Sequence, residues 1–310
     1  MRQTQRGRTF APEQQMYQPY SAAEDKQRTN SHYELPVEFF YTLTGGEWNV
    51  YSANIWSGAA TATESQQAKL DLLARLMDLQ PGQRILDVGC GWGGPLVYFC
   101  HTYGVQGVGL TLSALQKRAA EARIDRYGVH ANIIETHWQD YTADEGFDVV
   151  YTDEVIVHFF ALGDFFRKVY AWLKPGGRML NKELHLAHAR YSQMTPAMSF
   201  INEIFGSTGN YRTLAEELTL VGEAGFDVRT INQLSTLEYQ KTVDSWMANL
   251  RAERGRMEDL VGRDTLRRFL KYLQLCHYIH GGTRMTLDIV VSHKVPVPSG
   301  PVLVANSTST

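Results

Sequence analysis

A glycine-rich turn between residues 85 and 94 is the first segment of this 310-residue chain that is suited to chemistry. It reads ILDVGCGWGG, a strand-type run followed by alternating glycines, which let a backbone turn tightly and approach a ligand closely. The spacing GxGxGG differs from the GxGxxG of dinucleotide sites, and the Gly-Lys-Ser or Gly-Lys-Thr of a P-loop is absent. The segment predicts a nucleotide-binding turn of another kind; the alternative is a turn with only a structural role.

An acidic pair, Asp153 and Glu154, is the second such segment, because it follows the apolar run 147–151 and precedes Val-Ile-Val. A carboxylate at the end of a buried strand is costly to desolvate unless it has a partner or a task. Glu154 is therefore a candidate general base, and His158 is a candidate second proton acceptor. The structural alternatives are an ion-paired acid at Glu154 and a packed imidazole at His158.

Strands and helices alternate in the part of the chain that must position these residues. Apolar periodicity predicts strands at 84–88, 105–110, 131–136, 147–151, 178–186, 226–231 and 284–291. Helices are predicted at 93–103, 113–127, 162–173, 213–224, about 239–256 and about 258–280. This alternation predicts an α/β fold, a doubly wound parallel sheet whose ligands lie at the carboxyl ends of its strands.

The segments outside the sheet have less regular patterns. A helix is predicted over 63–79, with Ala68, Leu72, Leu76 and Leu79 on its apolar face. Residues 1–30 are polar and are predicted to form a flexible arm that can pair subunits in a homo-oligomer. Residues 296–310 are predicted to be a disordered tail.

Composition limits the possible partners. A formal net charge of −3 argues against a nucleic-acid partner, and no apolar run is long enough to cross a membrane. Three scattered cysteines make neither a disulfide framework nor a metal site. We therefore expect a cytoplasmic protein with a small-molecule substrate.

Several motifs together resemble those of S-adenosylmethionine-dependent methyltransferases, in particular the cyclopropane fatty acid and mycolic acid synthase family. The similar segments are the turn at 85–94, GLTLSALQ at 109–116, HYELPVEFF at 32–40, Tyr51-Ser52 and the helix 238–254. The resemblance covers about 30–295 and implies a methyltransferase domain at 31–295. It implies a Rossmann-like seven-stranded sheet with an antiparallel last strand, a helical lid at 31–80, and a helical substrate cap at 187–212 and 238–282.

The resemblance also implies which residues bind S-adenosylmethionine. Thr111, Ser113 or Gln116 would bind the ribose, Trp138 would stack on adenine, and Tyr33 with Tyr51-Ser52 would close over the sulfonium. The alternative for Trp138 is a half-buried core aromatic. The complete predicted cofactor set is Tyr33, Tyr51, Ser52, Asp87, Gly89, Gly91, Thr111, Ser113, Gln116, Trp138, Gln139 and Asp153.

The end of the fourth strand departs from the cyclopropane synthases. They have Phe-Glu-His there, and that Glu helps to hold a bicarbonate that serves as base. This chain lacks the Phe-Glu-His and their strand-five histidine, and it has Ala53 in place of their lid cysteine. Asp153-Glu154 is more similar to the strand end of prenyl-diphosphate and sterol C-methyltransferases. The predicted catalytic residues are Glu154, His158 and Tyr239; Tyr239, which matches a cyclopropane-synthase tyrosine, would orient Glu154 or a water.

A diphosphate acceptor needs cations, and basic residues follow the fifth strand. The predicted substrate ligands are Lys182, His185, Arg190, Tyr211 and Arg212, with solvated surface charge as the alternative for each. Mg²⁺ bridging the diphosphate near Glu183 or Glu203 is a further hypothesis.

Three functions are consistent with these patterns. The first is C-methylation of an alkene carbon of a prenyl (isoprenoid) diphosphate such as isopentenyl or geranyl diphosphate, with Glu154 deprotonating the carbocation. The second is a cyclopropane-fatty-acid-synthase-like methyltransferase that acts on unsaturated fatty acyl lipid. The 16 Tyr, 13 Phe and 6 Trp suit either, because aromatic faces stabilise cations. The third is a cofactor-binding scaffold without catalysis.

Overall fold

The computed structural model describes residues 21–24, 26–27, 35–192, 200–201, 204 and 210–295. Its principal elements, in chain order, are α2 (Val37–Thr44), α3 (Ala62–Met77), β1 (Arg84–Val88), α4 (Gly94–Tyr103), β2 (Gln106–Thr111), α5 (Ala114–Tyr127), β3 (Ala131–Glu135), β4 (Phe147–Asp153), η1 (Ile156–His158), α6 (Leu162–Trp172), β5 (Leu173–Leu186), η2 (Ala189–Ser192), α8 (Leu214–Glu223), β6 (Phe226–Leu234), α9 (Thr236–Ala252), α10 (Arg254–Val261), α11 (Arg263–His280) and β7 (Met285–Lys294). The predictions for 1–20 and 296–310 lie outside the described residues.

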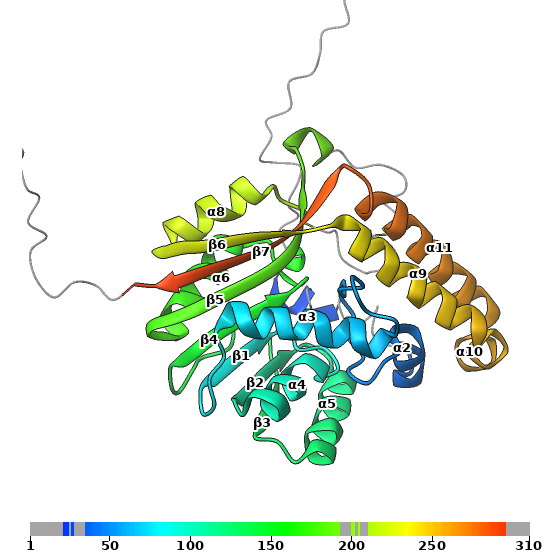
Figure 1. Cartoon of the computed structure of the whole chain (residues 1–310), viewed down its shortest axis with the longest axis horizontal. Helices are drawn as coiled ribbons and strands as arrows, with labels where there is room; N and C mark the ends of the chain where they lie inside the picture. The colour runs from blue at the N-terminus through cyan, green and yellow to red at the C-terminus, as the bar shows by residue number, and fades with distance from the viewer. Residues whose placement is uncertain are drawn as a thin grey trace, which may run out of the picture.

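A seven-stranded sheet in the order β3-β2-β1-β4-β5-β7-β6 forms the centre of the molecule (Figure 1). Strands β1 to β5 pair in parallel, whereas β7 runs antiparallel to both β5 and β6. Helices α4, α5 and α6 connect β1 to β2, β2 to β3 and β4 to β5, whereas the connection from β3 to β4 contains no helix. The predicted α/β sheet with an antiparallel last strand is confirmed.

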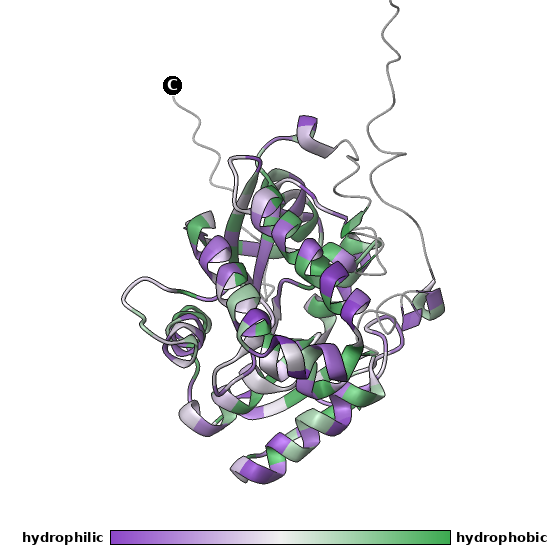
Figure 2. Cartoon of the chain, turned by 90° about the vertical axis from the view of Figure 1, so that its right-hand side faces the viewer, coloured by the Kyte–Doolittle hydropathy of each residue, from purple (hydrophilic) through white to green (hydrophobic). Residues whose placement is uncertain are grey.

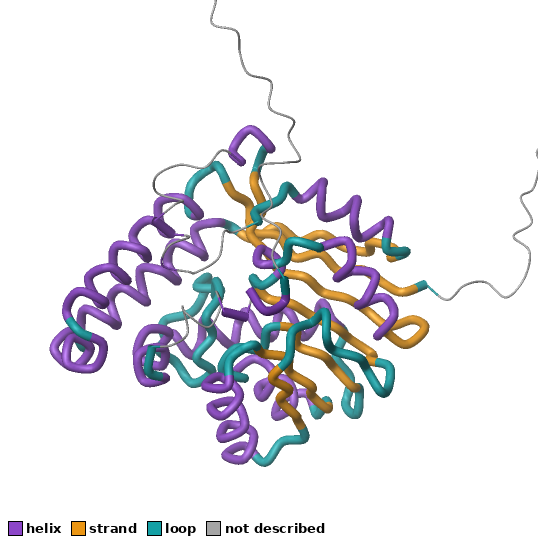
Figure 3. The backbone as a smooth tube through the Cα atoms, turned by 180° about the vertical axis from the view of Figure 1, so that it is seen from behind, coloured by secondary structure: helices purple, strands orange, loops and turns teal. Residues whose placement is uncertain are grey.

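Helices cover both faces of the sheet, because alternate residues of a central strand point to opposite sides. In β1, Ile85 packs with residues of α3 and α4, whereas Leu86 packs with residues of α6. Helices α3, α4 and α5 therefore lie on one face, and α6 and α8 lie on the other (Figures 1 and 3).

A helical cap, defined here as α2 with α9, α10 and α11, lies to one side of the sheet (Figure 1). Figure 2, in which these helices face the viewer, shows hydrophobic and hydrophilic residues alternating along them. Their apolar sides form one buried cluster with residues such as Phe39, Phe40, Trp246 and Phe269. Side chains of β5 and β7, Leu184 among them, join this cluster, so the cap is packed onto the sheet.

Two predictions about helices are wrong in detail. The predicted helix 258–280 is broken at Gly262, whose φ of 84° is outside the helical region, so the three helices α9, α10 and α11 lie where two were expected. The predicted apolar face of α3 is also displaced. Ala68, Leu72 and Leu76 are only half-buried, and the fully packed face instead includes Lys69.

No helix in the described part of the chain is long and apolar enough to cross a membrane.

Candidate active site

Two adjoining cavities lie at the carboxyl ends of β1, β2 and β4, with volumes of about 640 and 550 Å³. They share the lining residues Gly89, Gly91, Gln116, Glu154 and Val155. Gly91 has a φ of 51°, and a Cβ built on it would meet no atom within 4 Å, so the turn presents bare backbone to the cleft. The predicted glycine turn therefore forms the wall that both cavities have in common.

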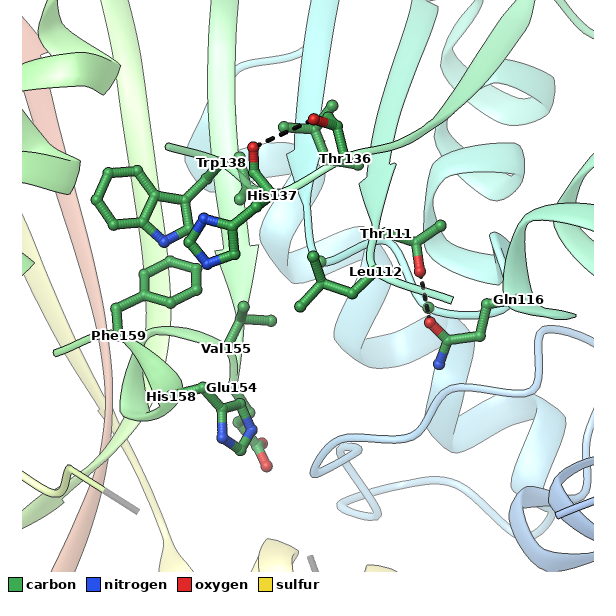
Figure 4. Close-up of a pocket in the computed structure, with 14 residues that line it drawn as sticks. Thr111, Leu112, Gln116, Thr136, His137, Trp138, Glu154, Val155, His158 and Phe159 are labelled. Atoms are coloured by element: carbon green, nitrogen blue, oxygen red, sulfur yellow. Dashed lines mark hydrogen bonds between the residues drawn. The ribbon is translucent and has the colours of Figure 1, made fainter. Parts of the chain in front are cut away.

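The 640 Å³ cavity is bounded by one largely aromatic wall and one polar wall. Figure 4 shows His137, Trp138 and Phe159 on one side and Thr111, Leu112 and Gln116 on the other, with Glu154 and His158 at the lower end. Thr111 donates a hydrogen bond from Oγ1 to Oε1 of Gln116, at 2.6 Å, and both residues line the cavity. Ser113 instead caps α5, accepting from the Gln116 N–H at 3.3 Å, and is not among the lining residues.

The aromatic wall differs from the sequence prediction. Trp138 lines the cavity, but its ring also packs among His137, Phe159 and Phe165, with centroids 5.4 to 5.5 Å away. His137, which no sequence motif indicated, lines the same wall. Gln139 is exposed on the following turn and is not among the lining residues, so its expected contact with adenine is not supported.

The 550 Å³ cavity is lined by polar groups from the lid and the strand ends. Tyr51 and Ser52 come from the lid, and Asp87 comes from β1. Asp87 accepts a hydrogen bond from the Tyr151 hydroxyl, at 2.5 Å. Burial raises the pKa of Asp87 to about 7, although this hydrogen bond acts to lower it. Tyr33, the remaining lid residue expected here, lies outside the described residues.

Asp153 lies at the centre of a buried ionic network. Its Oδ2 accepts hydrogen bonds from the Ser52 hydroxyl, at 2.7 Å, and from Nζ of Lys69, while its Oδ1 accepts from Nζ of Lys182 at 2.9 Å. Burial alone would raise the pKa of Asp153, but the ammonium groups of Lys182 and Lys69 hold it below its ordinary value. Asp153 is therefore an anion that joins the lid to strands β4 and β5.

Glu154 extends this network into the cleft. Its Oε1 accepts hydrogen bonds from the Ala53 N–H, at 2.7 Å, and from Nζ of Lys182. Its own N–H donates to the Lys182 carbonyl at 2.7 Å, and its φ of 59° is left-handed, which is unusual for a residue with a Cβ. Glu154 lines both cavities, so the predicted base is an ion-paired carboxylate that faces the cleft.

Lys182 and Lys69 have pKa values that move in opposite directions. Burial acts to lower the pKa of Lys182, but the charges of Asp153 and Glu154 raise it above its ordinary value. Burial lowers the pKa of Lys69, which Asp153 only partly offsets and the neighbouring Lys182 lowers further. The difference follows from the number of carboxylates, because Lys182 contacts two and Lys69 contacts one.

The other two predicted catalytic residues have different surroundings. His158 lines the 640 Å³ cavity from η1. Tyr239 is buried in the cap, and its hydroxyl is 3.0 Å from Nδ1 of His280, whose Nε2 is 2.9 Å from the Tyr211 hydroxyl. Burial lowers the pKa of His280 to about 4, so this imidazole is neutral at pH 7. Tyr239 therefore hydrogen-bonds to His280 and not to Glu154, and its role in orienting a water stays a prediction.

Most of the predicted diphosphate ligands bind other protein groups. Lys182 holds the two carboxylates described above. His185 lies between Glu217 and Asp288, with Nδ1 3.0 Å from the Asp288 carboxylate; burial acts to lower its pKa, but these two hydrogen-bonded carboxylates raise it to about 10. Arg212 donates to the carbonyls of Asn210, Phe159 and Phe160.

The other residues predicted to bind a diphosphate or Mg²⁺ give that prediction no further support. Tyr211 belongs to the His280 chain, and Arg190 is exposed on η2. Glu183 accepts from the backbone N–H groups of Val157 and Leu184. The described residues contain no group of three or more His, Cys, Asp and Glu side chains suited to a metal ion, and Glu203 lies outside them.

The cleft fits a molecule with a flat apolar end and a charged end. His137, Trp138 and Phe159 supply an aromatic wall, and bare glycine backbone separates that wall from Asp87 and Ser52. These are the requirements of S-adenosylmethionine, whose purine and charged amino-acid groups lie at opposite ends.

Sequence reasoning missed Lys69, His137 and His280. Only Lys69 had a recognisable signal, because it interrupts the stripe formed with Leu73 and Met77 at helical spacing. The other two depend on contacts that local patterns do not encode.

Comparison with known proteins agrees with this cleft. Residues 20–287 match the family model described as mycolic acid cyclopropane synthetase. Methoxy mycolic acid synthase MmaA3 of Mycobacterium tuberculosis is 28% identical over 277 residues, which cover 83% of this chain and 92% of that protein.

Two solved structures are similar over 87% of this chain and 98% of theirs. They are the cyclopropane synthase MmaA2 from Mycobacterium tuberculosis, with a TM-score of 0.81 and 23% identity, and mycolic acid cyclopropane synthase CmaA1 complexed with SAH and CTAB, with a TM-score of 0.80 and 25% identity. The cofactor is therefore S-adenosylmethionine, and the chain is a methyltransferase that belongs to the mycolic acid cyclopropane synthetase family.

Proposed function

We propose that this methyltransferase adds a methyl group to an alkene carbon of an unsaturated long-chain fatty acyl substrate. The family match and the names of the relatives, which are mycolic acid synthases, support an acyl acceptor. Prenyl diphosphate, the acceptor favoured by the strand-end motif alone, receives no such support.

One observation favours an acyl acceptor over a diphosphate: the cations at the carboxyl edge of the sheet are paired with groups of the protein itself. Lys182, His185 and Arg212 are each buried and each bound to protein carboxylates or carbonyls. A diphosphate would have to displace these partners, and leaving buried carboxylates unpaired is strongly unfavourable. An acyl chain requires no such exchange.

The cap offers apolar surroundings for an acyl chain. Leu184 of β5 and Ala53 of the lid belong to the same buried cluster as Tyr239 and Trp246 of α9. Ala53 is also the residue whose N–H binds Glu154, so the apolar cluster and the ionic network meet at the lid. This arrangement would place an alkene beside Glu154 while excluding water, which would otherwise trap a carbocation.

Glu154 has the role of proton acceptor in this proposal. S-adenosylmethionine, when bound, supplies an electrophilic methyl carbon. The alkene π electrons would form the new C–C bond to that methyl carbon as its bond to sulfur breaks, the electron pair remaining on the sulfur of S-adenosylhomocysteine. The positive charge that develops on the acyl chain is stabilised by the Glu154 carboxylate. Glu154 then takes a proton: loss from the added methyl group closes a cyclopropane ring, and loss from a neighbouring carbon leaves an alkene.

A substrate panel tests the acceptor class. The protein is incubated with methyl-labelled S-adenosylmethionine and, separately, with oleoyl phospholipid vesicles, an oleoyl carrier-protein thioester, and geranyl diphosphate. We expect label in at least one oleoyl substrate and none in geranyl diphosphate, with the product identified by mass spectrometry and NMR. Label in geranyl diphosphate alone would reject the acyl proposal.

A further inference from the structure

Lys69 is a charged core residue that the proposed chemistry does not use. It belongs to α3, is fully buried, and is not among the residues that line the two cavities. Its Nζ donates to the Ser52 hydroxyl oxygen, at 2.7 Å, and to Oδ2 of Asp153. Any effect of Lys69 on the reaction must therefore pass through its partners.

Those partners form a chain of alternating charge. Asp153 is bound by the ammonium groups of Lys69 and Lys182, and Lys182 is bound by the carboxylates of Asp153 and Glu154. Lys182 is thus shared, with Nζ 2.9 Å from Oδ1 of Asp153 and in hydrogen-bond contact with Oε1 of Glu154. Lys182 is divided between Asp153 and Glu154. Removing the charge of Lys69 therefore changes how strongly Lys182 binds Glu154.

We propose that Lys69 is a positioning residue that sets how tightly Lys182 holds the Glu154 carboxylate. Lys69 neutralises Asp153, and Lys182 therefore remains available to Glu154. Without Lys69, Lys182 moves toward Asp153, and Glu154 becomes a stronger base. The consequence for catalysis rests on the proposed function, in which Glu154 accepts the proton.

Other titratable groups face Glu154, but they do not mask the effect of Lys69 on it. They are Glu183 of β5 and the hydroxyls of Tyr211 and Tyr239. Burial, with a smaller contribution from Glu154, raises the pKa of Glu183 to about 8, and burial raises both tyrosine pKa values well above normal. Below pH 7 these three groups are therefore neutral, whereas Asp153 and the two lysines bring charge to Glu154. His158 lines the same cavity as Glu154 and is identical in all the variants compared, so it does not account for a difference between them.

The test measures the titration of Glu154 itself. Full-length protein with ¹³C-labelled glutamate carboxyl groups is titrated with S-adenosylhomocysteine bound, and the Glu154 signal is assigned from the Glu154→Gln spectrum. We expect the Lys69→Met titration to move to higher pH by about one unit. We expect Asp153→Asn to move it to lower pH, and the double variant Lys69→Met/Asp153→Asn to return it near the wild-type position.

The outcomes separate this proposal from the proposed function. Identical titrations in wild type, both single variants and the double variant overturn the role of Lys69. If the titrations move as expected but Glu154→Gln retains full methyl transfer, the role of Lys69 stands and the base assignment falls. If Lys69→Met does not fold, the Asp153→Asn and double variants carry the test, and an unmoved titration in Asp153→Asn overturns the proposal.

Discussion

Glu154 combines a strained backbone with a fixed side chain. Its left-handed φ of 59° costs about 1–2 kcal/mol for a residue with a Cβ. Its N–H is bound to the Lys182 carbonyl, and its carboxylate is bound to Lys182 and the Ala53 N–H. Such strain is retained where the surroundings fix the residue, and it is frequent at active sites. The strain therefore agrees with a carboxylate that is held in place for the reaction.

Substitution of Glu154 tests its role as base. We expect Glu154→Gln to lower kcat by about 100-fold or more, because the amide has the shape of the carboxylate but does not accept the proton. Affinity for S-adenosylhomocysteine, measured by calorimetry, is expected to remain within a few-fold of wild type. The matched control is Glu121→Gln on the exposed face of α5, which should leave kcat unchanged. Undiminished turnover in Glu154→Gln would assign the proton transfer to another group.

Whether the enzyme requires external bicarbonate is a second test of Glu154 as the base. The sequence departs from the motif with which cyclopropane synthases hold a bicarbonate base, and the Glu154 carboxylate is held by the Ala53 N–H and Lys182. We therefore expect turnover to be the same in bicarbonate-depleted and bicarbonate-containing buffer. Glu154→Ala removes this carboxylate, and we expect acetate or bicarbonate to restore part of its activity. A wild-type enzyme that stops in bicarbonate-depleted buffer would contradict the internal base.

Among the elements, the lid loop between α2 and α3 is the one most closely tied to the cofactor turn. A Cβ on Gly94 would lie 1.6 Å from the Trp48 carbonyl oxygen, so the loop backbone rests directly on the start of α4. Arg123 of α5 donates to the Glu47 carbonyl at 2.7 Å, which fixes the same loop from another side. The lid loop is therefore a built-in wall of the cleft.

Replacing Gly94 tests this close approach. We expect Gly94→Ala to lower the free energy of unfolding by about 2 kcal/mol or more, since the loop must shift to admit the methyl group. Gly222→Ala in α8 is the control, because a Cβ there meets nothing within 4 Å, and it should stabilise the protein by about 0.5 kcal/mol. Urea unfolding followed by circular dichroism measures both. Equal free energies of unfolding for Gly94→Ala and Gly222→Ala would show that the lid loop can shift without destabilising the protein.

The sequence specified the sheet and the cofactor turn well because both depend on local patterns. Apolar strand runs gave all seven strands, and the glycine turn forms the shared wall of the two cavities. The cap was less predictable: an apolar period over 258–280 does not show that Gly262 adopts a non-helical φ. Local helix propensity is a weak predictor where the backbone conformation of a single residue decides where a helix ends.

Long-range ionic contacts were the part that the sequence did not reveal. Lys69 meets Asp153, 84 residues away, and Lys182 meets Glu154, 28 residues away. Only the folded sheet brings these charges together. For this reason a lysine that appeared to be a diphosphate ligand proved to be the partner of the candidate base.

For the molecule as a whole, a second buried ionic group ties the sheet together beyond the cleft. His185 of β5 lies between Glu217 of α8 and Asp288 of β7, all three fully or nearly fully buried. The Gln233 side chain of β6 also donates to Asp288, at 3.1 Å. This group links β5, α8, β7 and β6 and gives stability a dependence on pH.

The sign of that dependence follows from the raised pKa of His185. Its folded-state pKa is about 10 and its ordinary value is 6.5, so the folded protein binds the extra proton between these values. The stability from His185 is complete below pH 6.5 and is lost as pH rises toward 10. We expect the free energy of unfolding, from urea titrations, to fall over this interval.

His185→Gln is the matched variant for this prediction. It should be about 3–5 kcal/mol less stable than wild type near pH 6.5, because Glu217 and Asp288 lose their cation. The variant should also show a shallower slope toward pH 10. The same slope in both proteins would mean that His185 is not the group responsible.

A competition assay tests the acceptor class most directly. The enzyme receives ¹³C-methyl S-adenosylmethionine with oleoyl phospholipid vesicles, an oleoyl carrier-protein thioester and geranyl diphosphate in one reaction, and mass spectrometry measures label in each. We expect the label to enter an oleoyl chain and to leave geranyl diphosphate unlabelled, and we expect labelling of the oleoyl chain to be lost in Glu154→Gln. Labelled geranyl diphosphate with unlabelled oleoyl chains would contradict it.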